Sequence, residues 1–247
     1  MKALKYILLF CFLLVSSFVF SQNWKLSRYA YTYGIGISNY FGDIGGASEA
    51  DASGFSDLDV AYSRPLLAVG YHYKMKERIA VKGNLTFANM HGSDANSFNE
   101  LRNYSFTTNI YQLSGHVEYH ITKEAQMVSY NRMSMRGKVN KFNTSINLYV
   151  FTGIGGAYYK VTAQDNLINE PRFTDDKHLT FVIPVGIGLK YPLTSSTYIG
   201  LEIGGHVTTT DFIDGLNSKS DANEYNDVYY FTVINVSTKI KRTKRRR

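Results

Sequence analysis

The feature that most constrains this chain is an alternation of apolar residues with small or polar ones along most of its length. From Tyr29 to Ile37, every second residue is Tyr or Ile, whereas the residues between them are Ala, Thr or Gly. Because successive side chains of a β-strand point to opposite faces, a period of two predicts strands with one apolar face. The pattern recurs in further segments, which are residues 67–74, 79–87, 111–120, 146–160, 181–189, 199–207 and 228–240.

Strands of this number and length can close into a barrel whose outer face meets lipid and whose inner face lines a narrow lumen. We therefore predict an all-β fold, a closed antiparallel transmembrane β-barrel of about eight strands. A soluble lipocalin-like barrel also alternates, but its apolar side points inward. The other face of these segments is rich in Gly and has few charges, which fits a lumen better than a water-exposed surface. The segment 146–160 is interrupted by glycines, and its facing is ambiguous, although Leu148, Val150 and Ile154 share one parity.

The N-terminal segment has the three parts of a secretory signal peptide. Residues 1–21 begin with lysines, continue through an apolar run and end with compact residues at the positions that signal peptidase requires. We expect cleavage before Gln22, which leaves a barrel of residues 22–240 and a basic tail of residues 241–247. An uncleaved anchor is the alternative, but the apolar run is short for a helix that spans a bilayer.

The composition of the remaining chain is compatible with one β domain. Cys11 is the single cysteine and lies in the predicted signal, so the mature chain has neither a disulfide nor a cysteine nucleophile nor a thiolate metal site. No later stretch is apolar for long enough to form a membrane helix. Strands are therefore the elements that we expect to cross the membrane.

The distribution of charge predicts which way the barrel faces. An even number of strands puts both termini on one side, which we expect to be the periplasm, with long loops outside and short turns inside. The formal net charge is +7, yet the predicted outer loops are acidic and the basic residues gather elsewhere. These loops are residues 41–59, 90–103, 161–178 and 210–227, and the inner turns are residues 75–78, 122–143 and 192–197. A charge separated in this way argues against nucleic acid as a partner.

The basic residues on the predicted inner face suggest a docking surface for an acidic periplasmic protein. The turn at residues 122–143 is long for an inner turn and strongly basic, and the tail at residues 241–247 is basic as well. The alternative is a solvated basic surface with no specific partner. The candidate partner contacts are Arg132, Arg136, Lys138, Lys141, Lys241 and Arg242.

Strand parity places several charged side chains inside the barrel. The interior of an eight-stranded barrel is filled by side chains, so we expect these groups to pair with one another and to close the lumen. The candidate lumen network consists of Arg64, Lys82, His116, Glu118, Lys190 and Glu202.

A metal site and a catalytic site are two alternatives to a purely structural network of lumen residues. His116, Glu118 and His120 share one face of a strand and could hold a metal ion, but same-face neighbours lie roughly 6.6 Å apart along a strand. Catalysis at the outer rim could use Asp211, Asp214 or His206, yet no activated-nucleophile pattern accompanies them. We therefore expect no enzymatic activity, no cofactor and no small-molecule substrate.

Several segments resemble the PorG-like outer-membrane barrels of Bacteroidota, which are part of the type IX secretion machinery. They occur in the same order and cover most of the chain after residue 21. The segments are residues 33–46 (YGIGISNYFGDIGG), 64–65 (RP), 101–106 (LRNYSF), 110–113 (IYQL), 183–191 (IPVGIGLKY), 199–204 (IGLEIG), 210–214 (TDFID) and 226–232 (NDVYYFT).

The resemblance implies a non-enzymatic component that ties a ring of periplasmic partner proteins, including a lipoprotein, to the outer membrane. The long basic turn at residues 122–143 and the basic tail depart from the family pattern. The alternative is a generic small outer-membrane barrel that serves envelope integrity or surface interaction, since one fold supports many functions.

Overall fold

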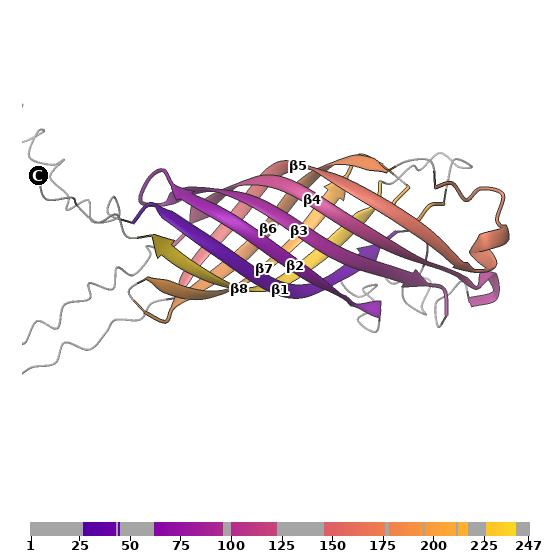
Figure 1. The fold of residues 1–247 in the computed structure, drawn as a ribbon, viewed down its shortest axis with the longest axis horizontal. Coiled ribbons are helices and arrows are strands. Elements are labelled where there is room, and N and C mark those ends of the chain that lie inside the picture. Colours follow the sequence, from indigo (N-terminus) through magenta and orange to yellow (C-terminus); the bar gives the residue numbers. More distant parts are fainter. Residues whose placement is uncertain are drawn as a thin grey trace, which may run out of the picture.

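The structure, a computed structural model, describes residues 27–42, 44, 62–95, 100–122, 146–175, 178–194, 196–210, 212–216 and 226–240. The predicted signal peptide and the basic tail lie outside these residues. Eight strands form a single closed barrel (Figure 1). They are β1 (Tyr29–Phe41), β2 (Arg64–Lys74), β3 (Ile79–Ser93), β4 (Tyr104–His120), β5 (Asn147–Asp165), β6 (Leu179–Pro192), β7 (Thr197–Thr208) and β8 (Val228–Ile240).

Each strand pairs with its neighbour in the sequence, and the first pairs with the last. All pairings are antiparallel, and β1 is bonded to β2 on one side and to β8 on the other. Tyr29 lies opposite Ile240, and Phe41 lies opposite Val228, so the seam between β1 and β8 runs the full length of both strands. The predicted closed antiparallel β-barrel is therefore confirmed. Within the described part of the chain, no helix is long and apolar enough to cross a membrane.

The two ends of the barrel differ, and we name them by what they carry. The terminal end contains the start of β1, the end of β8 and the short turns after β2 and β6 (Figure 1). The loop end carries the longer connections, including the short 3₁₀ helices η4 (Glu100–Arg102) and η5 (Asn166–Asn169).

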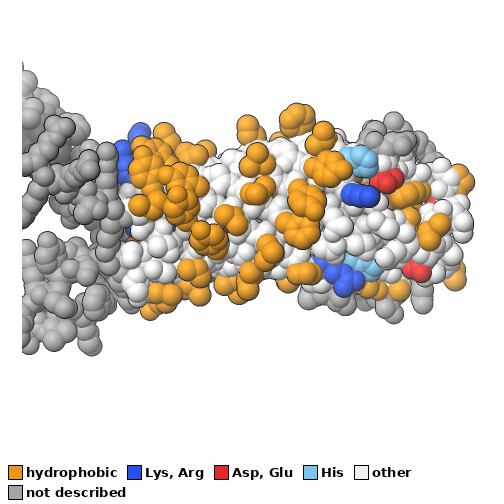
Figure 2. All heavy atoms as spheres, in the orientation of Figure 1, with side chains coloured by type: hydrophobic (Ala, Val, Ile, Leu, Met, Phe, Trp, Pro, Cys, Tyr) orange, Lys and Arg blue, Asp and Glu red, His pale blue; other side chains and the backbone are white. Residues whose placement is uncertain are grey.

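The apolar face of the strands points outward. Ile35 and Leu113 are 65% and 66% exposed, whereas Glu118, on an inward position of β4, is 1% exposed. Figure 2 shows apolar side chains spread over the outer surface of the strands. A lipocalin-like arrangement would reverse these faces, so that alternative does not describe this barrel. On β5, where the sequence was ambiguous, Leu148, Val150 and Ile154 all face outward.

Three strands extend further toward the loop end than the alternation predicted. β3 continues to Ser93, β4 begins at Tyr104, and β5 continues to Asp165. In this region both faces carry polar residues, so the pairing continues after the period of two has faded. Asn89 and Asn109, for example, are partners in the ladder, and their side chains form a hydrogen bond of 2.8 Å.

The loop-end half of the lumen is an apolar core, which the sequence analysis did not foresee. Residues 212–216 fold into the mouth of the barrel and bury Phe212, Ile213 and Leu216 against inward side chains such as Phe106 and Ile110. We call residues 212–216 the cap. Polar side chains therefore fill the lumen, as we expected, only in the half nearer the terminal end.

Hydrogen bonds from β4 and from the residue that precedes β8 hold the cap in place. The Ile213 carbonyl accepts a 2.7 Å hydrogen bond from the Thr108 hydroxyl, and the Ile213 N–H donates to Asp227 at 2.8 Å. The other oxygen of Asp227 accepts a 2.6 Å bond from the hydroxyl of Tyr40. Asp227 therefore links the cap to the seam between β1 and β8.

Glycines in β6 and β7 make room for large inward rings of β5. A Cβ atom at Gly188 would overlap the ring of Tyr149, and one at Gly186 would lie 2.5 Å from the ring of Phe151. The glycine-rich pattern of these strands is therefore a packing requirement and not only a means of bending.

We expect Gly188→Val to destabilise the barrel by about 1–3 kcal/mol, because the added methyl groups overpack a filled interior. Gly115→Val is the matched control, because a Cβ at that outward position meets no atom within 4 Å. Urea unfolding in detergent micelles measures both free energies of unfolding. Equal stability of the two variants would contradict the packing account.

Candidate functional site

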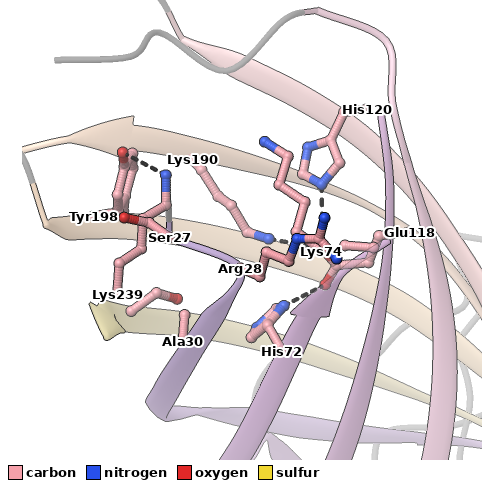
Figure 3. A pocket seen from close by; sticks show the side chains of 12 residues that line it. Ser27, Arg28, Ala30, His72, Lys74, Glu118, His120, Lys190, Tyr198 and Lys239 are labelled. Atoms are coloured by element: carbon pink, nitrogen blue, oxygen red, sulfur yellow. Dashed lines mark hydrogen bonds and ion pairs between the residues drawn. The ribbon is translucent and has the colours of Figure 1, made fainter. Parts of the chain in front are cut away.

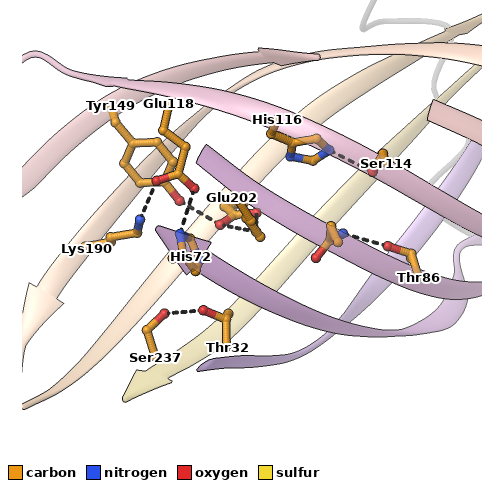
Figure 4. A network of polar contacts seen from close by, with 12 residues as sticks. Thr32, His72, Thr86, Ser114, His116, Glu118, Tyr149, Lys190, Glu202 and Ser237 are labelled. Carbon is orange, nitrogen blue, oxygen red and sulfur yellow. Dashed lines mark hydrogen bonds and ion pairs between the residues drawn. The ribbon is translucent and has the colours of Figure 1, made fainter. Parts of the chain in front are cut away.

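The candidate site is the polar interior between the cap and the terminal end, and its first half is built around Glu202 on β7. The Lys82 ammonium, from β3, donates to both carboxylate oxygens of Glu202 at 2.8 and 2.7 Å. The hydroxyl of Tyr149, from β5, donates to the same carboxylate at 2.7 Å. All three side chains are buried, so strands on opposite walls are joined across the lumen (Figure 4).

The second half is built around Glu118 on β4. The Lys190 ammonium, from β6, donates to Glu118 at 2.8 Å and lies 4.3 Å from the centre of the Tyr149 ring. His72 Nδ1 lies 3.3 Å from one oxygen of Glu118, and His120 Nε2 lies 3.5 Å from the other. The carboxylate thus has three neighbours that carry nitrogen, and Tyr149 contacts both ion pairs.

The charges of this network balance. Lys82 and Lys190 are matched by Glu202 and Glu118, and each of the four is less than 9% exposed. A buried charge is tolerated when it is paired and hydrogen-bonded, so the burial of these four groups is compatible with a stable barrel as long as both members of each pair are present.

Neutral polar groups connect the ion pairs to the apolar core. The hydroxyl of Tyr229 donates to Gln112 at 2.7 Å, and the amide of Gln112 lies 3.1 Å from His206 Nδ1. His116 bonds Ser114 at 2.9 Å. The polarity of the lumen therefore falls stepwise from the terminal end to the cap.

The structure places five of the six predicted lumen residues together. Lys82, His116, Glu118, Lys190 and Glu202 all lie in the buried interior. Arg64 does not, and its assignment to the network was wrong. It has inward parity, but it is the first residue of β2, opposite Ser38 at the loop end, and is exposed there. The parity of a residue in a strand specifies which face its side chain occupies, but it does not specify where the residue lies along the barrel axis.

The predicted partner contacts lie outside the described residues. This applies to Arg132, Arg136, Lys138, Lys141, Lys241 and Arg242. The described chain leaves the barrel after Thr122 and returns at Ile146, and β8 ends at Ile240, all at the terminal end.

His116, Glu118 and His120 do not converge on one point. The His116 ring stacks on Phe151, with ring centres 5.2 Å apart, and its Nε2 faces Ser114. Glu118 is occupied by the ammonium of Lys190, which would repel a metal ion. Among the residues that the structure describes, no group of three or more His, Cys, Asp or Glu is arranged to hold a metal.

Sequence reasoning missed the residues that complete the network. Tyr149 and Tyr229 are fully buried and bond to Glu202 and Gln112, although many other tyrosines of the barrel, such as Tyr31 and Tyr33, face outward. The signal was present for Tyr149, because the outward parity of Leu148 and Val150 implies that Tyr149 points inward. Nothing comparable marked Asp227, which lies just before β8 and is 2% exposed.

The connections at the loop end are braced by their own charged pairs. Arg102 makes two bonds to Asp94, at 2.7 and 3.0 Å, and the Tyr104 N–H donates to the same carboxylate. Beyond η5, the hydrogen bond from Arg172 holds the pKa of the Glu170 carboxyl below its usual range.

Breaking one charge pair should cost more than removing both members. We expect Lys82→Met to destabilise the barrel by about 3–5 kcal/mol, because Glu202 is left as a buried charge without its cation. The double variant Lys82→Met/Glu202→Gln should recover much of this loss. Urea unfolding in detergent measures each free energy. A double variant as unstable as the sum of its single variants would show that the two groups do not act as a pair.

The filled lumen should conduct poorly. In planar bilayers we expect no large, long-lived openings, because ion pairs fill one half of the interior and the apolar core fills the other. Ile213→Asp should raise the conductance by displacing the cap. A wild-type protein that conducts as an open pore would contradict this account.

Comparison with known proteins identifies a family and a general likeness of shape. Neisserial surface protein A has 9% identity and a TM-score of 0.48, with 86% of this chain and 97% of that one covered. Ail of Yersinia pestis has 12% identity and a TM-score of 0.42, with 86% and 97% covered. The outer membrane protein OprG of Pseudomonas aeruginosa has 10% identity and a TM-score of 0.44, with 87% and 98% covered.

These likenesses carry no inference about what the chain does. A comparison with curated protein sequences found no match. One family of sequences matches residues 4–238, which is nearly the whole chain. The chain therefore belongs to the family described as Domain of unknown function (DUF6089).

Proposed function

We propose that this protein is a non-enzymatic barrel of the bacterial outer membrane that anchors a periplasmic assembly of the type IX secretion machinery. The observation that carries the membrane part is a closed barrel with an apolar outer face. Every strand edge is paired, and side chains such as Ile35, Ile154 and Phe181 are 65–77% exposed. A closed ladder satisfies its own backbone hydrogen bonds, which is the condition for crossing lipid as strands.

A filled interior favours an anchoring role over a transport role. The buried ion pairs and the cap occupy the space through which a solute would pass. Functional contacts are then left to the two ends and the outer wall. The resemblance to PorG-like barrels supports a contact with a ring of periplasmic proteins, including a lipoprotein.

The basic segments supply a surface for that contact. Residues 123–145 and 241–247 are joined to the barrel at the terminal end, where Thr122, Ile146 and Ile240 lie. We place this end in the periplasm, because small outer-membrane barrels have short turns and both termini there. Exposed basic residues would increase the association rate and the specificity for an acidic partner.

A generic barrel that binds at the cell surface is the second candidate, and one observation favours it. Leu101 on η4 and Ile168 on η5 are 102% and 65% exposed at the loop end, although the connections around them are well braced. Apolar side chains held out from a rigid loop suit contact with another molecule.

Neutralising the basic turn separates the two candidates. We expect the combined replacement of Arg132, Arg136, Lys138 and Lys141 by Gln to weaken co-purification of periplasmic partners from native membranes and to reduce secretion. The difference from the wild type should shrink as ionic strength rises, because salt screens exposed charges over roughly 8–10 Å near physiological ionic strength and so weakens the wild-type attraction itself. Deleting residues 241–247 is the companion variant.

Two controls make the experiment decisive. Replacing the exposed cations Arg64, Lys160 and Arg172 at the loop end tests whether any loss of charge has the same effect. Heat-modifiable mobility in detergent gels shows whether each variant still forms a closed barrel. Wild-type co-purification and secretion by both the turn and the tail variants would overturn the anchoring role and favour the loop end as the interacting surface.

A further inference from the structure

The outer wall of the barrel has an apolar groove where β5, β6 and β7 adjoin. Its volume is about 230 Å³, and its lining includes the side chains of Leu148, Ile187, Leu189, Leu201 and Ile203. These side chains all have outward positions on their strands, whereas the charged residues of the network point into the lumen. We call this space the wall groove.

Two rows of side chains form the wall groove. Each row crosses the three strands through partners in the ladders, and the rows are Leu148, Leu189 and Leu201, and Val150, Ile187 and Ile203. The rows are roughly 6.6 Å apart, because same-face neighbours are two residues apart along a strand. Leu189 and Leu201 are only partly exposed and lie at the base of the groove, whereas Ile187 is 61% exposed and projects beside them.

On another part of the wall, aromatic rings fill the space between outward side chains. Tyr29 and Tyr31 on β1 pack against Tyr71 on β2, with ring centres 6.0 and 5.2 Å apart. The outward side chains that line the wall groove are all aliphatic. No ring covers the groove among the residues that the structure describes, so its apolar base is open to the surroundings of the barrel.

The position of the wall groove indicates what occupies it. Tyr191 on β6 lies two residues beyond Leu189 toward the terminal end, and it is exposed on the same outward face. Tyrosines of membrane barrels gather where the hydrocarbon meets the headgroups. The groove therefore begins just inside this boundary and is continuous with the apolar wall that faces lipid. Acyl chains of the adjoining leaflet are the molecules that reach it there.

The pocket inside the terminal end is a poor site for hydrocarbon by comparison. The charged side chains of Lys190, Glu118 and His72 line it, and its volume is about 50 Å³ (Figure 3). One water needs about 10–15 Å³ of such space, so this pocket holds about four water-sized atoms. The wall groove, with about 230 Å³, has room for roughly 15 to 20 atoms, which is the size of one acyl chain.

We propose that the wall groove binds one acyl chain of a membrane phospholipid from the leaflet at the terminal end. The chain lies between the two rows and against Leu189 and Leu201, and its headgroup stays at the level of Tyr191. Because the lining is aliphatic, the groove binds the chain and not the headgroup. This inference rests on the membrane part of the proposed function and is independent of the secretion role.

Native mass spectrometry of the purified barrel tests this proposal. The barrel is released from detergent micelles that contain palmitoyl-oleoyl-phosphatidylethanolamine, whose headgroup has no net charge. We expect one phospholipid to stay bound at a lipid concentration at which further copies dissociate. Excess glycerophosphoethanolamine, the headgroup without acyl chains, should not displace it. Loss of every phospholipid, or displacement by the headgroup alone, would overturn the proposal.

Variants that fill the wall groove assign the bound phospholipid to it. Leu201→Trp and Ile203→Trp should each lower the affinity for phospholipid at least about tenfold, because the larger ring occupies the space of the acyl chain. Val185→Trp is the matched control, because Val185 is outward on β6 and 52% exposed but does not line the groove.

Two further measurements keep the outcomes distinct. Heat-modifiable mobility shows which variants form a closed barrel, and closed Leu201 and Ile203 variants with wild-type affinity would refute the site. Insertion of the wild-type barrel into phospholipid vesicles tests the membrane part of the proposed function separately. A barrel that inserts but retains no phospholipid would refute the wall groove alone, and a barrel that does not insert would refute both.

Discussion

In the seam between β1 and β8, the first described strand of the chain is hydrogen-bonded to the last, from Tyr29 opposite Ile240 to Phe41 opposite Val228. This pairing removes both free edges of the sheet and makes an inside and an outside. The outward face can then be apolar, and the inward face can hold charges that would not be tolerated on an open sheet in lipid. The ion pairs and the cap both require the enclosed lumen that the seam completes.

Because the lumen is enclosed, its side chains can change from charged and polar at one end to apolar at the other. In the half nearer the terminal end, Lys82 and Lys190 are matched with Glu202 and Glu118, and the hydroxyl of Tyr149 donates a second hydrogen bond to one oxygen of Glu202. Toward the loop end, Phe106, Ile110 and the cap form a buried apolar core. Ion pairs thus fill one half of the lumen, and apolar side chains fill the other. The anchoring role that we propose follows from this filling, which leaves the ends and the outer wall as the surfaces for contact.

The alternation of residues was enough to predict the strands, their faces and the closed barrel. It placed Lys82, Glu118, Lys190 and Glu202 inside because a strand has only two faces. It could not show that Arg64 lies beyond the lumen, because height depends on the stagger between strands and parity does not record it. The sequence pattern did not predict the burial of the cap, and the reason is different. Phe212 and Ile213 lie in a connection with no periodic pattern, and their burial depends on Thr108 and Asp227, which are distant in the sequence.

The seam has a consequence for the order of events during synthesis. Tyr40 and Asp227, which bond at the end of the seam, are 187 residues apart, so the contact forms only after nearly the whole chain has been synthesised. Until then, the edge of β1 lacks its hydrogen-bonding partner, β8, and the sheet remains open. Topologies dominated by such distant pairings fold slowly and expose surfaces that aggregate. A chain built in this way therefore has an unpaired strand edge for as long as its last strand has not been made.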